Sequence, residues 1–284
     1  MAPVHHWTMV LDRGQRLEIV DTFVQWIGEH PSCRMQIVLC LESIPMGDSK
    51  VEMRRFADAH ALARAAADEV AGQLAQAYAA RGIATLVVSG GRSPVGFFEE
   101  LRSRRLEWHK VTITLADERW VEPTVAGSNE RLVRNALLTG AAGAARFIGL
   151  KNGAPSPELG AAAAWEPLAR LPRPFDVVIL GMGEDGHTAS LFPGSPRLAS
   201  AIDPDAAPGC IAMWSPAVPH ARVSLNLSAL LGSRRIAILL FGEAKLRTYV
   251  KACATGAVED MPVRALLRQT RVPVELLWTP EPAE

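Results

Sequence analysis

The sequence of 284 residues predicts an α/β fold, in which a mostly parallel sheet carries helices on both faces. Hydrophobic runs of strand length alternate along the chain with segments of helical periodicity. These runs are hydrophobic along their whole length, which is typical of strands that are buried on both faces of a parallel sheet. Hydrophobic residues make up 49% of the chain and charged residues 21%, as in ordinary globular proteins.

The first 53 residues lack the regular alternation of the remainder. LEIVDTFVQWIGEH is compatible with a short helix and MQIVLCLESI with a strand, but neither has a clear partner. We interpret residues 1–53 as a leader that is either poorly ordered or precedes the native start, with Met35, Met46 and Met53 as alternative start residues. Residues 54–284 then form a single α/β domain.

The regular pattern begins at Arg54 with a long amphipathic helix. Hydrophobic residues recur every three or four positions from Phe56 to Tyr78, and Gly82 is a C-terminal stop signal. The remaining elements alternate in order: strand IATLVVSGG, helix VGFFEELRSR, strand KVTITLA, helix SNERLVRNALL with Ser128 as N-cap, strand RFIGL, helix PELGAAAAWEPLARL, strand FDVVILG, strands RVSLNLS and RRIAILLFG, helix EAKLRTYVKACAT and strand VPVELLWT. Ligands of such sheets bind at the carboxyl ends of the strands, so the loops there are the candidate sites.

Composition argues against several classes of partner. Thirty Lys and Arg residues balance thirty Asp and Glu residues, so no net field favours nucleic acid or an anionic membrane. No apolar run approaches the roughly 20 residues that span a bilayer. The four cysteines form no C-x-x-C pair, which gives no indication of a metal site and favours a reducing, cytoplasmic setting.

The first candidate loop is SGGRSPVG, which follows a strand and precedes a helix. Ser89, Gly90, Gly91, Arg92 and Ser93 supply flexible backbone N–H groups, hydroxyls and a positive charge, the chemistry of a phosphate cradle at a helix N-terminus. A tight turn that needs glycine for geometry alone is the alternative. The loop matches neither nucleotide-binding glycine motif, so a nucleotide is not indicated.

The second candidate loop is ADERWVEP, in which Asp117 and Arg119 follow a very apolar strand. Charged residues at that point would face the crevice at the edge of the sheet. A solvated charged turn is the alternative, although the large ring of Trp120 favours a walled pocket.

The third loop is GMGEDGHTASLFPGSP, at the end of the strand FDVVIL. Its glycines permit a sharp turn that places His187 directly after Glu184 and Asp185. A carboxylate that orients an imidazole makes it a better general base, which is the role we expect for His187. A structural histidine is the alternative, and a metal ligand is less well supported because the loop holds no second His or Cys.

Two cations complete the set. Lys245 lies in the first turn of a helix that follows a strand, and Arg222 opens the strand RVSLNLS. Either side chain is also compatible with a solvated position. Together the loops predict an enzyme for a small phosphorylated substrate that uses no nucleotide, metal or other cofactor. No G-x-S-x-G motif is present, so attack by activated water is favoured over an acyl-enzyme.

These motifs resemble the glucosamine-6-phosphate isomerase/6-phosphogluconolactonase family, and its lactonases in particular. The resemblance runs from about Phe56 to Trp278 and rests on FADAHALA, SGGRSP, DERWVEP with SN after it, FDVVILGMGEDGHTASLFPG, RVSLNLSAL and FGEAK. It implies a Rossmann-like sheet of the glucosamine-6-phosphate deaminase type. It also implies hydrolysis of 6-phospho-D-glucono-1,5-lactone to 6-phospho-D-gluconate in the oxidative pentose phosphate pathway, by a monomer or small homo-oligomer without a cofactor. The family usually has a small hydroxyl residue where Arg92 stands, and an arginine there adds positive charge.

The resemblance also assigns roles to the site residues. His187 takes the position of the general base, with Asp185 or Glu184 orienting it. The glycine cradle and Lys245 match phosphate-binding positions. Arg119, Asp117 and Arg222 match positions that contact the phosphate or the sugar acid, and the lactone end is the alternative for Arg119.

Two other functions compete with the lactonase. A glucosamine-6-phosphate deaminase would share the glycine cradle and the lysine, but a deaminase has a glutamate soon after the histidine, where this chain has TASLFP. A sugar-phosphate sensor on the same fold would carry a DNA-binding helix-turn-helix ahead of the domain, and the leader has no convincing pair of helices joined by a short turn.

Overall fold

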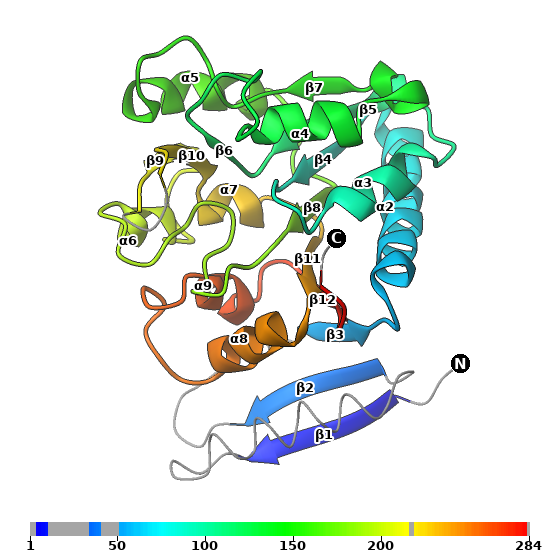
Figure 1. The fold of residues 1–284 in the computed structure, drawn as a ribbon, viewed down its shortest axis with the longest axis vertical. Helices are drawn as coiled ribbons and strands as arrows, with labels where there is room; N and C mark the ends of the chain where they lie inside the picture. The colour runs from blue at the N-terminus through cyan, green and yellow to red at the C-terminus, as the bar shows by residue number, and fades with distance from the viewer. Residues whose placement is uncertain (1–3, 11–33, 41–50, 216–218, 283–284) are drawn as a thin grey trace.

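The computed structural model describes residues 4–10, 34–40, 51–215 and 219–282 (Figure 1). Its main sheet has nine strands within these residues, in the order β1-β2-β3-β12-β11-β8-β4-β5-β7. From β3 to β7 every neighbouring pair is parallel, whereas β2 pairs with β3 in the antiparallel direction. The strands span Val4–Val10 (β1), Arg34–Cys40 (β2), Glu52–Arg55 (β3), Ala84–Val88 (β4), Val111–Leu115 (β5), Arg146–Ile148 (β7), Val177–Leu180 (β8), Ile236–Phe241 (β11) and Val274–Thr279 (β12).

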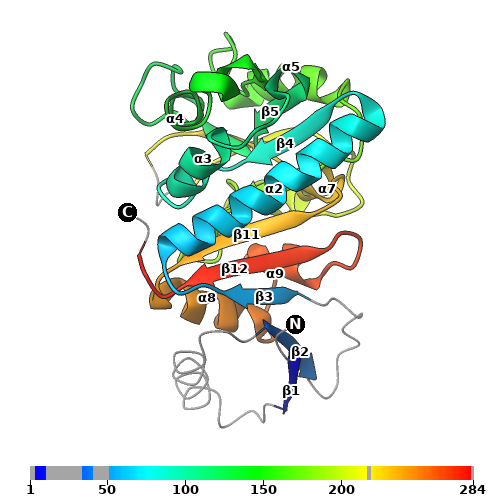
Figure 2. The same cartoon turned by 90° about the vertical axis from the view of Figure 1, so that its right-hand side faces the viewer.

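Helices cover both faces of this sheet. Figure 2 shows α2 (Ala59–Arg81) running across the strands on one face, next to α3 (Val95–Arg102). The opposite face carries α7 (Leu227–Leu231), α8 (Glu243–Cys253) and α9 (Val263–Arg268). The mostly parallel, doubly covered sheet predicted from the sequence is thereby confirmed.

A second, smaller sheet contains three antiparallel strands among the described residues, in the order β6-β10-β9. They are β6 (Asp117–Arg119), β9 (Cys210–Met213) and β10 (Arg222–Leu225), and α5 (Pro157–Ala169) packs against β9. Two short helices, α4 (Asn129–Ala136) and α6 (Leu198–Ala201), complete this part of the chain. Because β6 follows β5 almost directly, this sheet lies beside the carboxyl edge of the main one.

The structure corrects the prediction that a helix begins at Arg54. Arg54 and Arg55 lie in β3, which pairs with β12, and α2 begins only at Ala59. The side chain of Arg54 donates to Glu275 of β12 at 2.9 Å, a contact that sequence periodicity does not reveal. Glu52 and Met53, placed in the leader by the sequence, are therefore part of the sheet.

Two further predictions change. The acidic segment after β5 is the strand β6 and not a turn, and only Arg222–Leu225 of RVSLNLS is a strand, in the second sheet. Asn226 then ends that strand and caps α7 by accepting from the Ala229 N–H. The strand expected in the leader is confirmed by β2, whereas the expected helix LEIVDTFVQWIGEH lies outside the described residues.

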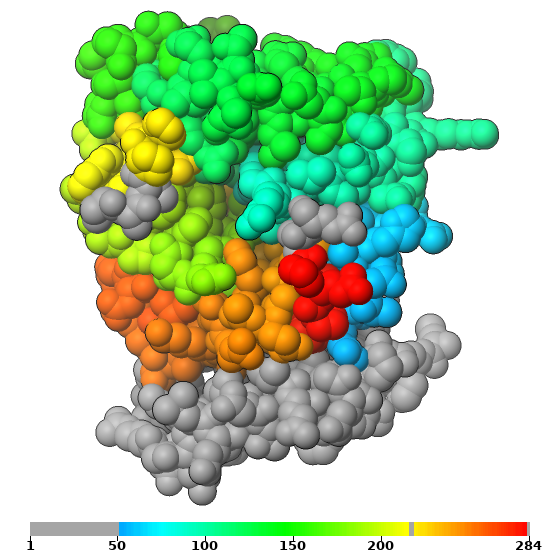
Figure 3. All heavy atoms as spheres, viewed as in Figure 1, coloured from blue at the N-terminus to red at the C-terminus, as the bar shows by residue number. Residues whose placement is uncertain are grey.

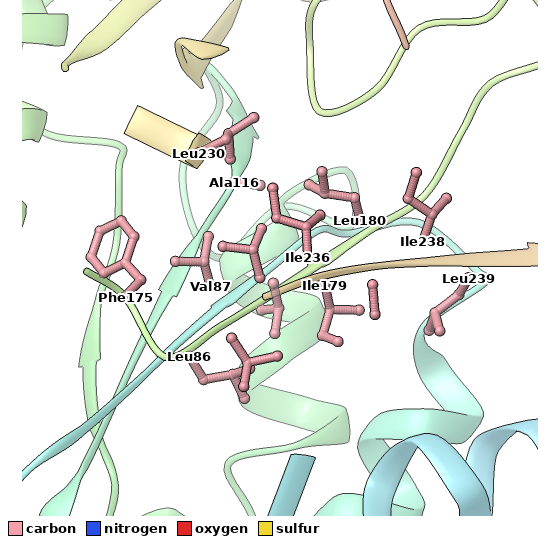
Figure 4. Packing of buried hydrophobic residues seen from close by; sticks show 14 of the residues in the cluster. Leu86, Val87, Ala116, Phe175, Ile179, Leu180, Leu230, Ile236, Ile238 and Leu239 are labelled. Carbon is pink, nitrogen blue, oxygen red and sulfur yellow. The ribbon is translucent and has the colours of Figure 1, made fainter. Parts of the chain in front are cut away.

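The core lies between the strands and their covering helices. Figure 4 shows side chains of β4, β8 and β11 packed together with Phe175 and Leu230. Leu86, Val87 and Ile238 have no exposed surface, as expected for strands that are covered on both faces. The rigid strands fix where their carboxyl ends, and the loops that follow them, lie relative to one another.

Candidate active site

A cleft of about 600 Å³ opens at the carboxyl edge of the main sheet, between that edge and the second sheet. In Figure 3 the segments near residues 90, 190 and 243 meet near the centre of the visible face. All of the site residues predicted from the sequence line this cleft except Asp185. Those that line it are Ser89, Gly90, Gly91, Arg92, Ser93, Asp117, Arg119, Glu184, His187, Arg222 and Lys245.

The glycine loop after β4 forms one wall of the cleft. Gly91 has a φ of +86°, a conformation that a side chain would disfavour, and it turns the chain toward α3. Ser89 is nearly buried, and its hydroxyl has no hydrogen-bond partner in the described part of the chain. A cleft-lining hydroxyl, glycine N–H groups and the start of a helix are together suited to an anion.

His187 and Asp185 form a pair at the end of β8. The Nδ1 atom of His187 lies 2.5 Å from Oδ1 of Asp185, which also accepts from the His187 backbone N–H at 3.1 Å. Burial raises the pKa of Asp185, but its hydrogen bond with His187 and the charge of that ring outweigh burial and bring the pKa below its ordinary value. With Nδ1 engaged, Nε2 is the ring nitrogen available to the cleft.

Glu184 does not share this contact. Its carboxylate makes no hydrogen bond to His187 in the described structure, and its backbone carbonyl accepts from Thr248 at 3.4 Å. The alternatives that the sequence left open, Asp185 or Glu184, thus differ in geometry, and only Asp185 touches the imidazole.

The local backbone makes this pair possible. A Cβ on Gly183 would overlap the His187 ring and lie 2.5 Å from the Asp185 carboxylate. Gly183 N–H also donates to the His187 carbonyl at 2.9 Å, which closes the turn. Gly186 has a φ of +79° and its carbonyl accepts from Val263 at the start of α9, so the loop is fastened to a helix.

Two arginines enter the cleft from the second sheet. Arg119 of β6 and Arg222 of β10 face each other in the antiparallel register. Arg222 is almost fully buried, and its Nε has no partner within the described residues. Burial lowers the pKa of Arg222, and the neighbouring charge of Arg119 lowers it further. Two guanidinium groups held so close favour a ligand that carries negative charge or electron-rich oxygens.

Asp117 and Lys245 complete the predicted set. Asp117 is buried and accepts from the Ser190 hydroxyl at 2.5 Å, which ties the histidine loop to the second sheet. Lys245 lies in the first turn of α8, and its ammonium donates to the Met182 carbonyl. Burial lowers the pKa of Lys245, partly offset by the carboxylates of the histidine loop.

Sequence reasoning missed several residues of this site. Phe192 lines the cleft with its ring centroid 4.6 Å from that of His187, and Asn129 lines it beside Gly90. Glu118, which has no exposed surface, receives four hydrogen bonds beneath Arg119. In the sequence, only the SN dipeptide pointed to Asn129. Its contacts with Asp117 and Arg119 of β6 depend on the three-dimensional fold, which a sequence pattern does not show.

No three His, Cys, Asp or Glu side chains in the described ranges are grouped so that they could hold a metal ion. Among the helices of those ranges, none is long and apolar enough to cross a membrane.

Comparison with known proteins identifies the family of this chain. Residues 57–278 match the family model of glucosamine-6-phosphate isomerases/6-phosphogluconolactonase. A 6-phosphogluconolactonase of Pseudomonas aeruginosa is 49% identical over 218 residues, which cover 77% of this chain and 90% of that protein. A counterpart from Rhizobium meliloti is 44% identical over 228 residues, covering 80% of this chain and 98% of the relative.

Solved structures are similar as well. The crystal structure of a 6-phosphogluconolactonase from Shewanella baltica has a TM-score of 0.77 and 46% identity, covering 80% of this chain and 97% of that one. A monomeric glucosamine-6-phosphate deaminase, with a TM-score of 0.64 and 18% identity over 80% of this chain and 96% of that one, shares the fold. The chain belongs to the glucosamine-6-phosphate isomerase/6-phosphogluconolactonase family.

Proposed function

We propose that this chain hydrolyses 6-phospho-D-glucono-1,5-lactone to 6-phospho-D-gluconate, the lactone step of the oxidative pentose phosphate pathway. The observation that carries the proposal is one cleft that holds both a carboxylate-oriented histidine and a set of anion-binding groups. The relatives that are 44–49% identical are named 6-phosphogluconolactonase, which supports the same substrate.

In the proposed reaction His187 is the general base. Its Nε2 accepts a proton from water as the water oxygen bonds to the lactone carbonyl carbon, and Asp185 stabilises the imidazolium that forms. The bond between the carbonyl carbon and the ring oxygen then breaks, and the imidazolium returns the proton to that oxygen. The products are a carboxylic acid, which ionises, and a hydroxyl, so the net change is the addition of one water.

The cationic groups of the cleft bind opposite ends of the substrate. The cradle from Ser89 to Ser93 and Lys245 bind the phosphate, and Arg119 with Arg222 faces the lactone, where the carbonyl oxygen gains negative charge. A general base contributes about 10²–10⁴-fold and an oxyanion donor about 3 kcal/mol. Because a lactone is already an activated ester, these effects and correct orientation suffice without a cofactor.

The test is an assay with freshly prepared 6-phosphogluconolactone, in which loss of lactone is followed above its spontaneous hydrolysis. His187→Ala should lower kcat by about 10²-fold or more with an unchanged melting temperature. A wild-type rate equal to that of buffer would exclude the lactonase. Release of ammonia from glucosamine 6-phosphate by the same preparation would instead identify a deaminase.

We also propose that the enzyme is cytoplasmic. Cys210 and Cys253 are both free thiols, and burial raises the pKa of Cys210 to about 12 and that of Cys253 to about 11. Unpaired, protonated thiols agree with a reducing compartment, which supports a cytoplasmic enzyme.

A further inference from the structure

Asn129, the first residue of α4, links two walls of the cleft. Its side-chain nitrogen donates to the Asp117 carbonyl at 2.8 Å, and its side-chain oxygen accepts from Nη1 of Arg119 at 2.5 Å. The same amide lies against the glycine cradle, since a Cβ on Gly90 would overlap it. Only 2% of Asn129 is exposed, so this amide has little freedom to adopt another arrangement.

The buried carboxylate of Glu118 holds Asn129 in place from below. Its Oε1 accepts the backbone N–H groups of Arg119 and Asn129, both at 2.7 Å. Its Oε2 accepts from the Glu130 N–H at 2.7 Å and from the Ser128 hydroxyl at 2.9 Å. Although burial raises the pKa of Glu118, these hydrogen bonds at the start of α4 oppose that shift. The backbones of β6 and α4 are thus joined at one point.

These contacts determine which nitrogen atoms of the Arg119 guanidinium remain available to a ligand. Its Nη1 is committed to two acceptors, Asn129 and the Gly127 carbonyl at 2.9 Å. Its Nε and Nη2 make no hydrogen bond within the described residues, and Arg119 lines the cleft, so these atoms are the ones offered to a ligand. Without the Asn129 oxygen, Arg119 would keep a single anchor and a long, rotatable side chain.

We infer that Asn129 is a positioning residue, which acts through Arg119 and sets that guanidinium at a fixed distance from the glycine cradle of residues 89–93. The inference rests on the proposed function for its substrate and deepens it. A substrate whose phosphate sits in the cradle then meets Arg119 at a defined position along its length. The side-chain oxygen of Asn129 is committed to Arg119 and one of its N–H groups to the Asp117 carbonyl, so its effect on the substrate passes through Arg119.

A double-mutant cycle of kcat/KM tests the inference. We expect a loss of about 10²-fold for Arg119→Ala and about 10-fold for Asn129→Ala, each measured on the lactone. If Asn129 acts through Arg119, the double variant stays within about threefold of Arg119→Ala alone. Independent contributions would multiply to about 10³-fold, and that result would overturn the inference, as would an Asn129→Ala enzyme equal to the wild type.

A second variant of Asn129 separates an effect on Arg119 from a loss of folding. Asn129→Ala leaves the Asp117 carbonyl without its donor, whereas Asn129→Ser keeps a hydroxyl near that carbonyl but, being one bond shorter than the amide, withdraws the acceptor from Arg119. The same coupling is expected with either variant. Arg134→Ala on the same helix is the matched control: its side chain is 53% exposed and pairs with Glu130, so its kcat/KM should stay within about twofold of the wild type.

The cycle is repeated as a Kd for 6-phosphogluconate, measured by calorimetry. Binding requires no turnover, so a wild-type enzyme that fails to hydrolyse the lactone would sink the proposed function and leave the coupling between Asn129 and Arg119 measurable. Additive losses in Kd would contradict the positioning role whatever the activity of the wild type.

Discussion

Substitution of Asp185 by Asn separates the two carboxylates that precede the histidine. The change preserves the size of the side chain and removes its charge. In the wild type, Oδ1 of Asp185 is 2.5 Å from Nδ1 of His187 and also accepts the backbone N–H of that residue. An amide can still accept these bonds, but it no longer stabilises an imidazolium, and its NH₂ group can hold the ring in the opposite tautomer.

The expected loss in kcat is about 10- to 10²-fold. A hydrogen bond to a charged group contributes about 1.5–3 kcal/mol, and each 1.4 kcal/mol corresponds to a factor of ten. The Asp185 side chain is 46% exposed and that of His187 31%, so water screens part of their interaction. The loss in kcat should therefore be much smaller than the loss of about 10⁴-fold that follows when a fully buried aspartate behind a catalytic histidine is replaced by asparagine.

The assay is steady-state hydrolysis of fresh 6-phosphogluconolactone, with Glu184→Gln as the matched variant. Glu184 lines the cleft but does not touch the imidazole, so its substitution should cost less than about threefold in kcat. A large effect of Glu184→Gln with a small effect of Asp185→Asn would refute the assignment. Since the pKa of Asp185 is lowered in the fold, its contribution to stability exists above its ordinary pKa of 3.8 and is lost as pH falls through the lower, folded value. The melting temperatures of wild type and Asp185→Asn should thus converge in strong acid.

Three other outcomes are expected. Gly183→Ala should lower kcat at least about tenfold with a folded circular dichroism spectrum, because a Cβ there displaces the His187 ring; normal kcat would contradict the geometry. Burial lowers the pKa of Lys245 below 10.5, so calorimetric affinity for 6-phosphogluconate should fall as pH rises through that lowered value, and Lys245→Arg should abolish the fall. An equal decline in both proteins would exclude Lys245 as the cause. Asp58→Ala, which removes the N-cap acceptor of the Ala61 N–H in α2, should cost about 1 kcal/mol in chemical denaturation without changing kcat, and an unchanged unfolding midpoint would contradict that cap.

The sequence predicts the main sheet well because its signals are local. The strands β4, β5, β8, β11 and β12 are short apolar runs bounded by glycine, proline or charge, and their order along the chain leaves few ways to pair them. The carboxyl-end rule then gathers the glycine loop, the histidine loop and Lys245 at one edge, where the structure also has them.

The second sheet was not predictable in the same way. β6 is only Asp117–Arg119, three polar residues with no alternation, and it is a strand because β10 pairs with it from about a hundred residues further on. The same limitation hid Glu118, since a carboxylate looks solvated in a sequence until four donors are brought to it by the fold. Arg54 was assigned to a helix for a related reason, because its partner Glu275 lies at the other end of the chain.

The main sheet contributes the histidine loop to the cleft, and the second sheet contributes the two arginines. Each kind of group needs a different local structure to hold it. The proposed general base, His187, needs a fixed ring position, and the glycines around it let the chain turn sharply at the end of a parallel strand. Two arginines side by side repel one another, so each needs anchors that offset the cost of holding it there. Arg119 has its two oxygen acceptors, and Arg222 is flanked in its sheet by the charges of Asp117 and Glu118. With the Ser89 hydroxyl and the Arg222 Nε both buried and unpaired within the described residues, an oxygen-rich anion is the ligand that would complete the hydrogen bonding of both walls.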